Sequence, residues 1–210
     1  LRRPTTRQLK LTCWIQSPDT TMKVALIQLD PVIGDLSANT AAIIEAITAA
    51  AEASASLVVF PELAICGYPP RDLLFREGFL EACEAATAAV ASQTQGITAI
   101  VGHPRRDGDH LRNSVSVCRD GEVAACYDKR LLPGYDVFDE DRYFTPGHDA
   151  VIIDVDDHRV GLLICEDLWQ AGDVHHRTDY EGDPVQDLID RSCDLLVCSS
   201  ASPFEVGKQA

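Results

Sequence analysis

Three reactive side chains in this sequence stand directly beyond apolar runs that are typical of buried strands. Glu62, Lys129 and Cys165 each follow such a run by one or two residues. Open α/β sheets place their active sites at the carboxyl ends of strands. A carboxylate, an ammonium and a thiol suffice for acyl transfer, because the acid can take the thiol proton and the ammonium can stabilise negative charge that develops on oxygen.

Each of these three residues also has an ordinary structural explanation. A glutamate at a strand end commonly faces solvent or caps a helix, a single lysine is usually on the surface, and cysteine is among the most buried residue types. Positions along the chain do not measure separation in space. Residue types and spacing therefore leave open whether the three side chains form one site.

The elements that must position these residues alternate between strand and helix patterns. Strands are expected at 24–29, 57–60, 98–102, 113–118, 122–127, 151–155, 160–164 and 195–199, and helices at 39–54, 78–95 and 184–191. The turn residues Asp120-Gly121 predict one hairpin, and Asp156-Asp157-His158 predict another. Ser37 and Asn39 are the candidate caps of the first helix. Strand-helix-strand units mixed with hairpins predict an α/β sandwich with mixed sheets.

Length and composition indicate a globular domain. The chain has 210 residues, of which 46% are hydrophobic and 24% charged, with a net charge of −15. Such an acidic surface repels phosphate backbones, so no nucleic-acid partner is expected. There is no apolar run of membrane-spanning length and no secretory signal pattern, and the expected location is the cytoplasm. The 8 cysteines include no CxxC pair, so reduced thiols and no metal site are expected.

The two ends of the chain carry separate expectations. The first methionine is Met22, where a basic polar stretch gives way to an apolar run. Residues 1–21 are therefore expected to be an N-terminal extension, disordered or non-native, and 22–210 to form the domain. The chain stops shortly after the strand at 195–199 with no helix left to cover the sheet, which predicts a domain incomplete at its C-terminal end.

Three ordered motifs resemble the signatures of the nitrilase superfamily of carbon-nitrogen hydrolases. They are Val59-Phe60-Pro61-Glu62-Leu63, Lys129-Arg130-Leu131-Leu132-Pro133 and Cys165-Glu166-Asp167-Leu168-Trp169. The resemblance implies a nitrilase-like α-β-β-α sandwich and a homo-oligomer. It also implies a Glu62, Lys129 and Cys165 triad with Glu140 as an auxiliary residue, and no metal.

Within that superfamily, the stretches 62–74, 132–144 and 202–208 resemble the amide-hydrolysing domain of the glutamine-dependent NAD synthetase family. The resemblance implies that L-glutamine is hydrolysed through a cysteine thioester, and that the ammonia passes to a synthetase domain that amidates nicotinic acid adenine dinucleotide. No cofactor is implied for the glutaminase step. ATP and Mg²⁺ belong to the synthetase domain, which this chain lacks. The implied substrate-binding residues are Tyr68, Tyr135, Glu166, Trp169, Ser202 and Lys208.

Two other functions remain open at this point. One is a free-standing nitrilase-family amidase acting on another small amide, and the other is a catalytically silent scaffold domain. The adjacent pair His175-His176 is expected in a solvated loop and not at a metal, because the two side chains point apart and lack acidic or thiol partners at ligand spacing.

Overall fold

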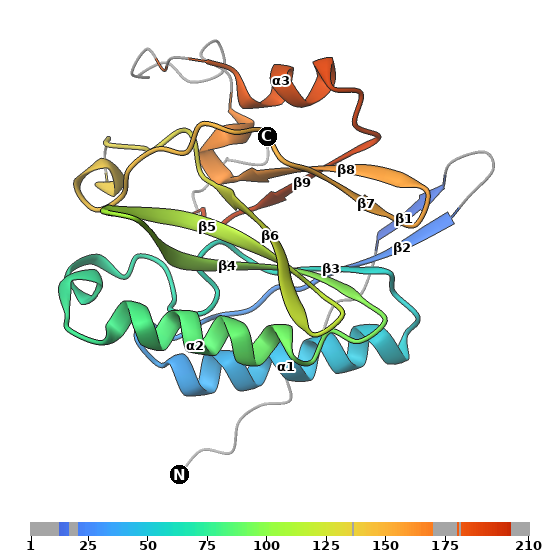
Figure 1. Ribbon diagram of the computed structural model, residues 1–210, viewed down its shortest axis with the longest axis horizontal. Helices are drawn as coiled ribbons and strands as arrows, with labels where there is room; N and C mark the ends of the chain where they lie inside the picture. Colours follow the sequence, from blue (N-terminus) through green and yellow to red (C-terminus); the bar gives the residue numbers. More distant parts are fainter. Residues whose placement is uncertain (1–12, 17–20, 136, 170–179, 181, 203–210) are drawn as a thin grey trace.

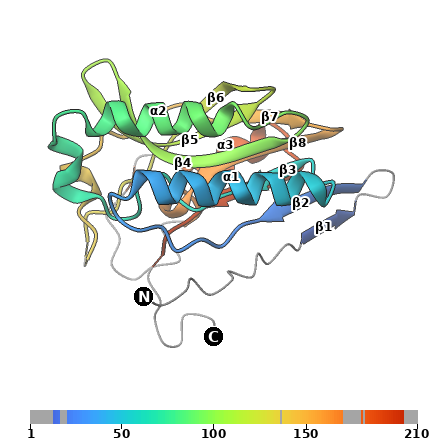
Figure 2. The ribbon, with the colours of Figure 1, turned by 90° about the horizontal axis from the view of Figure 1, so that it is seen from below.

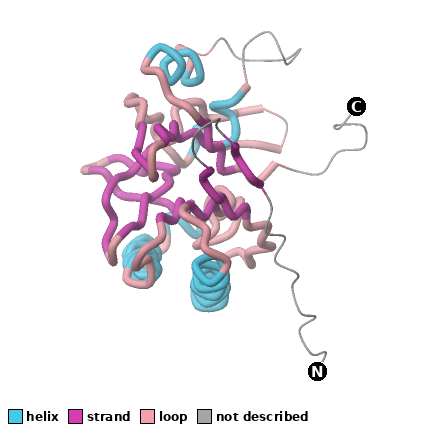
Figure 3. The backbone as a smooth tube through the Cα atoms, turned by 90° about the vertical axis from the view of Figure 1, so that its right-hand side faces the viewer, coloured by secondary structure: helices cyan, strands magenta, loops and turns pink. Residues whose placement is uncertain are grey.

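The computed structural model arranges the chain in four layers. It describes residues 13–16, 21–135, 137–169, 180 and 182–202. Two helices, α1 and α2, cover one face of a larger sheet, a smaller sheet lies on the opposite face, and α3 covers the outside of the smaller sheet (Figure 1). Figure 3 shows the two sheets as adjacent layers with helices outside them. The α-β-β-α sandwich with mixed sheets is thus confirmed.

The larger sheet has six strands in the order of the chain. They are β1 (Cys13–Gln16), β2 (Thr21–Leu26), β3 (Leu57–Val59), β4 (Thr98–Asp107), β5 (His110–Arg119) and β6 (Glu122–Asp128). The strands β2, β3 and β4 run parallel, and the remaining neighbours are antiparallel. Residues Cys13–Gln16 pair with β2, although the sequence places them in an extension outside the domain.

The smaller sheet contains β7 (Ile152–Val155), β8 (His158–Ile164) and β9 (Leu195–Ser199). Its predicted β7–β8 hairpin is antiparallel, and β9 returns parallel to β8 after the helix α3 (Pro184–Asp190). The described residues also include three 3-10 helices, at Arg71–Phe75, Glu140–Arg142 and Cys165–Leu168.

The helices α1 (Leu36–Glu52) and α2 (Phe79–Ala91) lie side by side beneath the larger sheet (Figure 2). The buried Ile43, Ile47 and Ala50 of α1 recur at helical spacing. The cap predicted at Ser37 or Asn39 is wrong, because Asp35 caps α1 by accepting from the Ala38 N–H at 3.0 Å. Asn39 is instead buried inside the helix.

An apolar core fills the space between the two sheets. Side chains of β2 to β6 meet those of β7 to β9 there, among them Val59, Val115, Tyr127, Leu162 and Ile164. Strand β3 is buried on both faces, which explains why its sequence is a continuous apolar run and not an alternating one. No helix in the described part of the chain is long and apolar enough to cross a membrane.

Strand β4 continues five residues beyond the expected end at Gly102 and forms a long hairpin with β5. Gly102 and Pro104 are poor strand formers, which is why the sequence pattern stops there. Pairing with β3 ends at Ile100, and the Gly102 carbonyl on the same edge still accepts from the Ile65 N–H, so among the described residues no strand pairs with that edge at Pro104. A free edge tolerates the proline, since its missing N–H removes no bond to a second neighbour.

Gly102 allows the loop that carries Glu62 to cross β4 closely. A Cβ atom at Gly102 would lie 2.4 Å from the Leu63 nitrogen and 2.5 Å from the Pro61 oxygen. The loop is also bonded to β4 through the Ile65 N–H, which donates to the Gly102 carbonyl at 3.1 Å. The missing side chain is therefore a condition for the position of Glu62.

We expect Gly102→Ala to lower the free energy of unfolding by about 1–3 kcal/mol or more, because the added carbon meets backbone that cannot move independently. Gly161→Ala in β8 is the matched control. The three atoms nearest to a Cβ there belong to the side-chain tips of Leu188 and Leu196, at 3.0 to 3.2 Å. Chemical denaturation of both variants measures the difference, and equal costs would contradict the explanation.

Candidate active site

Lys129 is buried between two carboxylates at one end of the sandwich. Its Nζ donates to Glu62 Oε1 at 2.7 Å and to both carboxylate oxygens of Glu140, at 2.8 and 2.9 Å. The three residues come from the loop after β3, the end of β6 and a 3-10 helix, and Lys129 is only 1% exposed. A buried ion cluster of this kind requires its charges to be paired, and one ammonium here serves two acids.

Asn113 completes this cluster, and the sequence analysis did not identify it. Its Nδ2 donates to Glu62 Oε1 at 2.8 Å and to Glu140 Oε2 at 3.2 Å. Its backbone carbonyl accepts from the Lys129 N–H at 2.8 Å. An asparagine inside a strand carries no sequence signal for chemistry. Only the pairing of β5 with β6 reveals its proximity to the lysine.

Cys165 occupies a strained turn at the end of β8. Its φ angle is +45°, in the left-handed region that non-glycine residues rarely adopt. The side chain is 7% exposed, and Sγ lies 3.5 Å from Ser202 Oγ. Cys165 also interacts electrostatically with Glu62 and Lys129. The structure thus brings Glu62, Lys129 and Cys165 into one electrostatic cluster, and Ser202 lies beside the thiol.

Asp167 ties the cysteine turn to the lysine loop. Its Oδ2 accepts from the Ile164 N–H at 3.0 Å and from the Tyr127 hydroxyl at 2.8 Å. Its Oδ1 accepts from the N–H groups of Arg130 and Leu131, at 3.0 and 2.8 Å. One buried carboxylate therefore fixes the backbone on both sides of the site. The sequence analysis included Asp167 in a motif but gave it no role.

The electrostatics of the cluster keep the lysine charged and the thiol protonated. Burial lowers the pKa of Lys129, but the carboxylates of Glu62 and Glu140 outweigh it and hold that pKa well above its usual value. Burial also raises the pKa of Glu140, against the lowering effect of the ammonium. Burial and the Glu62 charge raise the pKa of Cys165 to about 12, against the lowering effects of Lys129 and Ser202. Attack by this sulfur therefore needs a base.

The predicted pocket residues form two groups around this centre. Tyr68 donates from its hydroxyl to Glu140 Oε1 at 2.8 Å. Glu166 is buried and accepts from the Tyr135 hydroxyl at 3.1 Å and from the Tyr180 hydroxyl at 3.3 Å. Tyr180 was not among the predicted residues, because no motif surrounds it.

Of the remaining residues singled out in the sequence, one is described by the structure and the others are not. Trp169 follows the cysteine motif and is 37% exposed. Lys208, His175 and His176 lie outside the described residues. Within the described ranges, no three or more histidine, cysteine, aspartate or glutamate side chains are grouped so that they could hold a metal ion.

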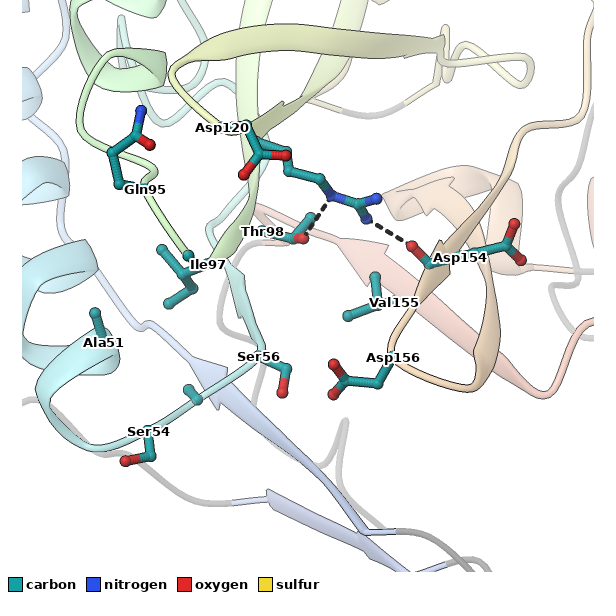
Figure 4. A pocket seen from close by; sticks show the side chains of 13 residues that line it. Ala51, Ser54, Ser56, Gln95, Ile97, Thr98, Asp120, Asp154, Val155 and Asp156 are labelled. Carbon is teal, nitrogen blue, oxygen red and sulfur yellow. Dashed lines mark hydrogen bonds between the residues drawn. The ribbon is translucent and has the colours of Figure 1, made fainter.

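A separate cavity of about 610 Å³ lies at the opposite end of the strands (Figure 4). Its lining includes Ser56 before β3, Thr98 at the start of β4 and Asp156 in the β7–β8 turn. Arg119 donates to Thr98 Oγ1 at 2.9 Å and to the Asp154 carbonyl at 2.6 Å. Both bonds are dashed in Figure 4, and the one to Asp154 joins the larger sheet to the smaller one, so the arginine serves a structural role there.

Comparison with known proteins agrees with this geometry. The carbon-nitrogen hydrolase family model matches residues 23–176, and the chain belongs to this family. A glutamine-dependent NAD(+) synthetase from Xanthomonas campestris is 45% identical over 193 residues, which cover 90% of this chain and 33% of that protein. The chain spans about a third of the length of the curated relatives that it matches.

Solved structures of similar proteins have the same fold. A glutamine-dependent NAD+ synthetase from Acinetobacter baumannii, in complex with ADP, superposes with a TM-score of 0.79 at 36% identity, over 88% of this chain and 33% of that one. An amidase from Nesterenkonia sp. reaches a TM-score of 0.73 at 24% identity, over 88% of this chain and 66% of its own. At that identity the amidase shows the fold alone.

We expect Lys129→Met to destabilise the protein by roughly 3–5 kcal/mol, because it leaves two carboxylates buried without their cation. The pair then takes up a proton, and its folded-state pKa rises above the unfolded value of about 4.3. A folded pKa that is raised makes stability greatest at low pH, so the variant should lose stability as pH rises above about 4. Thermal unfolding across pH measures this loss.

The double variant Lys129→Met with Glu62→Gln serves as the control, since it leaves one carboxylate and should regain part of the lost stability. A pH dependence equal to that of the unchanged protein would contradict the prediction.

Proposed function

We propose that this chain is a glutaminase domain that releases ammonia from L-glutamine for the amidation of nicotinic acid adenine dinucleotide to NAD+. The observation that carries the proposal is the buried thiol beside a lysine that is shared by two carboxylates. The choice of glutamine as substrate and of a synthetase domain as partner is based on the similarity to glutamine-dependent NAD synthetases. The glutaminase step uses no cofactor in this proposal, and ATP and Mg²⁺ serve only the synthetase domain.

The first step is attack on the glutamine side-chain amide. Cys165 Sγ bonds to the amide carbon, and its proton passes to Glu62 as the general base. The negative charge that forms on the amide oxygen is stabilised by the Lys129 ammonium and the backbone N–H of Glu166. Each such donor is typically worth about 2.7–4 kcal/mol. Glu62 then returns the proton to the nitrogen, the carbon-nitrogen bond breaks, and ammonia leaves.

The second step is hydrolysis of the thioester. Glu62 takes a proton from water, the water oxygen bonds to the acyl carbon, and the carbon-sulfur bond breaks to release glutamate. The thiolate regains its proton from Glu62. Glu140 is auxiliary in this scheme, because both of its carboxylate oxygens accept from the Lys129 ammonium and hold it in place.

Recognition of glutamine is assigned to Glu166 and the two tyrosines that bond to it. The buried carboxylate of Glu166 suits the α-ammonium group of glutamine. The hydroxyls of Tyr135 and Tyr180 donate to this carboxylate and orient it. Tyr68, Trp169, Ser202 and Lys208 are proposed as the further substrate-binding residues. The proposal places the protein in the cytoplasm and includes a homo-oligomer.

The experiment that tests this function uses the full-length protein, which includes the synthetase domain. It measures glutamate release with and without ATP and nicotinic acid adenine dinucleotide. Stimulation of glutamine hydrolysis by these two ligands supports the proposal. Turnover of other small amides without turnover of glutamine would show a free-standing amidase. An absence of any turnover would show a silent scaffold.

In the full-length protein, which includes the synthetase domain, we expect Cys165→Ala to abolish glutamine hydrolysis, because no thioester can form, and to leave synthesis from added ammonia intact. Cys118→Ala, which removes a buried thiol on β5 away from the cluster, is the control and should keep its turnover. Coupled assays with glutamine or ammonium chloride measure both activities. Glutamine turnover retained by Cys165→Ala would remove this residue from the mechanism.

Lys129→Arg should lower kcat for glutamine at least about 100-fold, since a planar guanidinium cannot replace a compact ammonium between two carboxylates and a small oxyanion. Lys23→Arg is the matched control, because that ammonium donates to the Ala53 carbonyl near the end of α1. Steady-state kinetics distinguish the two variants. A near-normal rate for Lys129→Arg would make Lys129 peripheral to the chemistry.

A further inference from the structure

Glu62 has two oxygens with different surroundings. Its Oε1 accepts from both Lys129 Nζ at 2.7 Å and Asn113 Nδ2 at 2.8 Å. Its Oε2 accepts only from the Ala201 N–H, at 3.2 Å, among the described residues. A carboxylate oxygen has two lone-pair positions. Both positions of Oε1 are therefore filled, and one position of Oε2 remains for a proton.

We infer that Asn113 is a positioning residue that holds Glu62 so that Oε2 is the oxygen that receives the proton of Cys165. The inference rests on the proposed function and deepens it at the same site. Asn113 does not touch the sulfur in this assignment, and it acts through the carboxylate.

The position and orientation of Asn113 are themselves determined by the fold. The residue is 1% exposed in β5, and its carbonyl bonds to the Lys129 backbone. The two donor hydrogens of its amide point at two carboxylates, which cannot donate, so the nitrogen must lie on that side. Its Oδ1 is buried without a hydrogen-bond partner among the described residues. An arrangement that leaves a buried acceptor unsatisfied indicates that the two donated bonds are the required ones.

The same amide also limits the repulsion between the two acids. Glu62 and Glu140 share one ammonium, so the three charges sum to −1 in a buried place. Asn113 gives one N–H to each carboxylate, which favours their charged forms. The titratable groups that face Glu62 are Lys129, Glu140, Tyr68, Cys165 and Cys198. None of these five groups is a neutral donor to both acids, as Asn113 is.

The test compares the intact protein with Asn113→Leu, which keeps a similar volume and removes the donors. We expect kcat for glutamine to fall about tenfold, with KM changed by less than about twofold, because the change affects proton transfer and not substrate contact. The acid limb of the kcat profile should move up by about one pH unit, because a carboxylate that loses a donor binds its proton more tightly.

A second readout does not use glutamine. The rate at which iodoacetamide alkylates Cys165, followed by mass spectrometry of its peptide, should fall about tenfold at neutral pH and show the same shift of the acid limb. If the unchanged protein does not hydrolyse glutamine, the proposed function fails, and the alkylation profile still tests Asn113 by itself.

Two further variants make the test decisive. Asn113→Ser keeps one donor and should give intermediate shifts in both profiles, and it serves where Asn113→Leu does not fold. Ser116→Ala removes a buried hydroxyl on the opposite face of the same strand, which contacts His103 and not the cluster, and should leave both profiles unchanged. Unmoved acid limbs in a folded Asn113 variant, or a rise in KM with kcat unchanged, would overturn the inference.

Discussion

The site depends on the hydrogen bonds that the Lys129 ammonium donates to Glu62 and Glu140. One cation is shared by two buried carboxylates, and the three charged groups come from three different parts of the chain. Removing the ammonium leaves both carboxylates without compensation in a place closed to water, where an unpaired charge is costly. The loop after β3, the end of β6 and the 3-10 helix Glu140–Arg142 are thereby held in one relative arrangement. The lysine thus has a structural role in addition to the one proposed for it in chemistry.

This arrangement explains why a cysteine with a high pKa suits the proposed reaction. A thiol with a pKa of about 12 is protonated at neutral pH and resists unwanted oxidation and alkylation. The adjacent carboxylate raises that pKa by repelling a thiolate, and the same carboxylate is the base that can accept the proton when substrate arrives. The ammonium favours negative charge nearby, either on sulfur or on the substrate oxygen. Reactivity is therefore tied to the presence of a bound amide.

The positions of most elements could be predicted from hydrophobic runs and turn residues, because these patterns report local burial. The hairpin at Asp120-Gly121 and the strand Leu195–Ser199 are examples. The extension of β4 past Gly102 could not be predicted, since it depends on pairing with β5. At the site, Glu62, Lys129 and Cys165 stood out because each follows an apolar run typical of a buried strand, and only the family resemblance grouped them into one site. Asn113 and Asp167 were missed because their importance comes from hydrogen bonds between segments far apart in the chain.

The two sheets must also keep a fixed offset, because Lys129 and Cys165 belong to different sheets. The apolar core between the sheets is favourable but non-directional, and by itself it permits small sliding. Directional polar bonds cross between the sheets at both ends. Tyr127 of β6 bonds to Asp167 beside the cysteine, and Arg119 of β5 bonds to the Asp154 carbonyl of β7 at the far end. Hydrogen bonds weaken steeply with misalignment, so these two ties define the offset more sharply than burial does. The acid and amine on one sheet thereby stay in register with the thiol on the other.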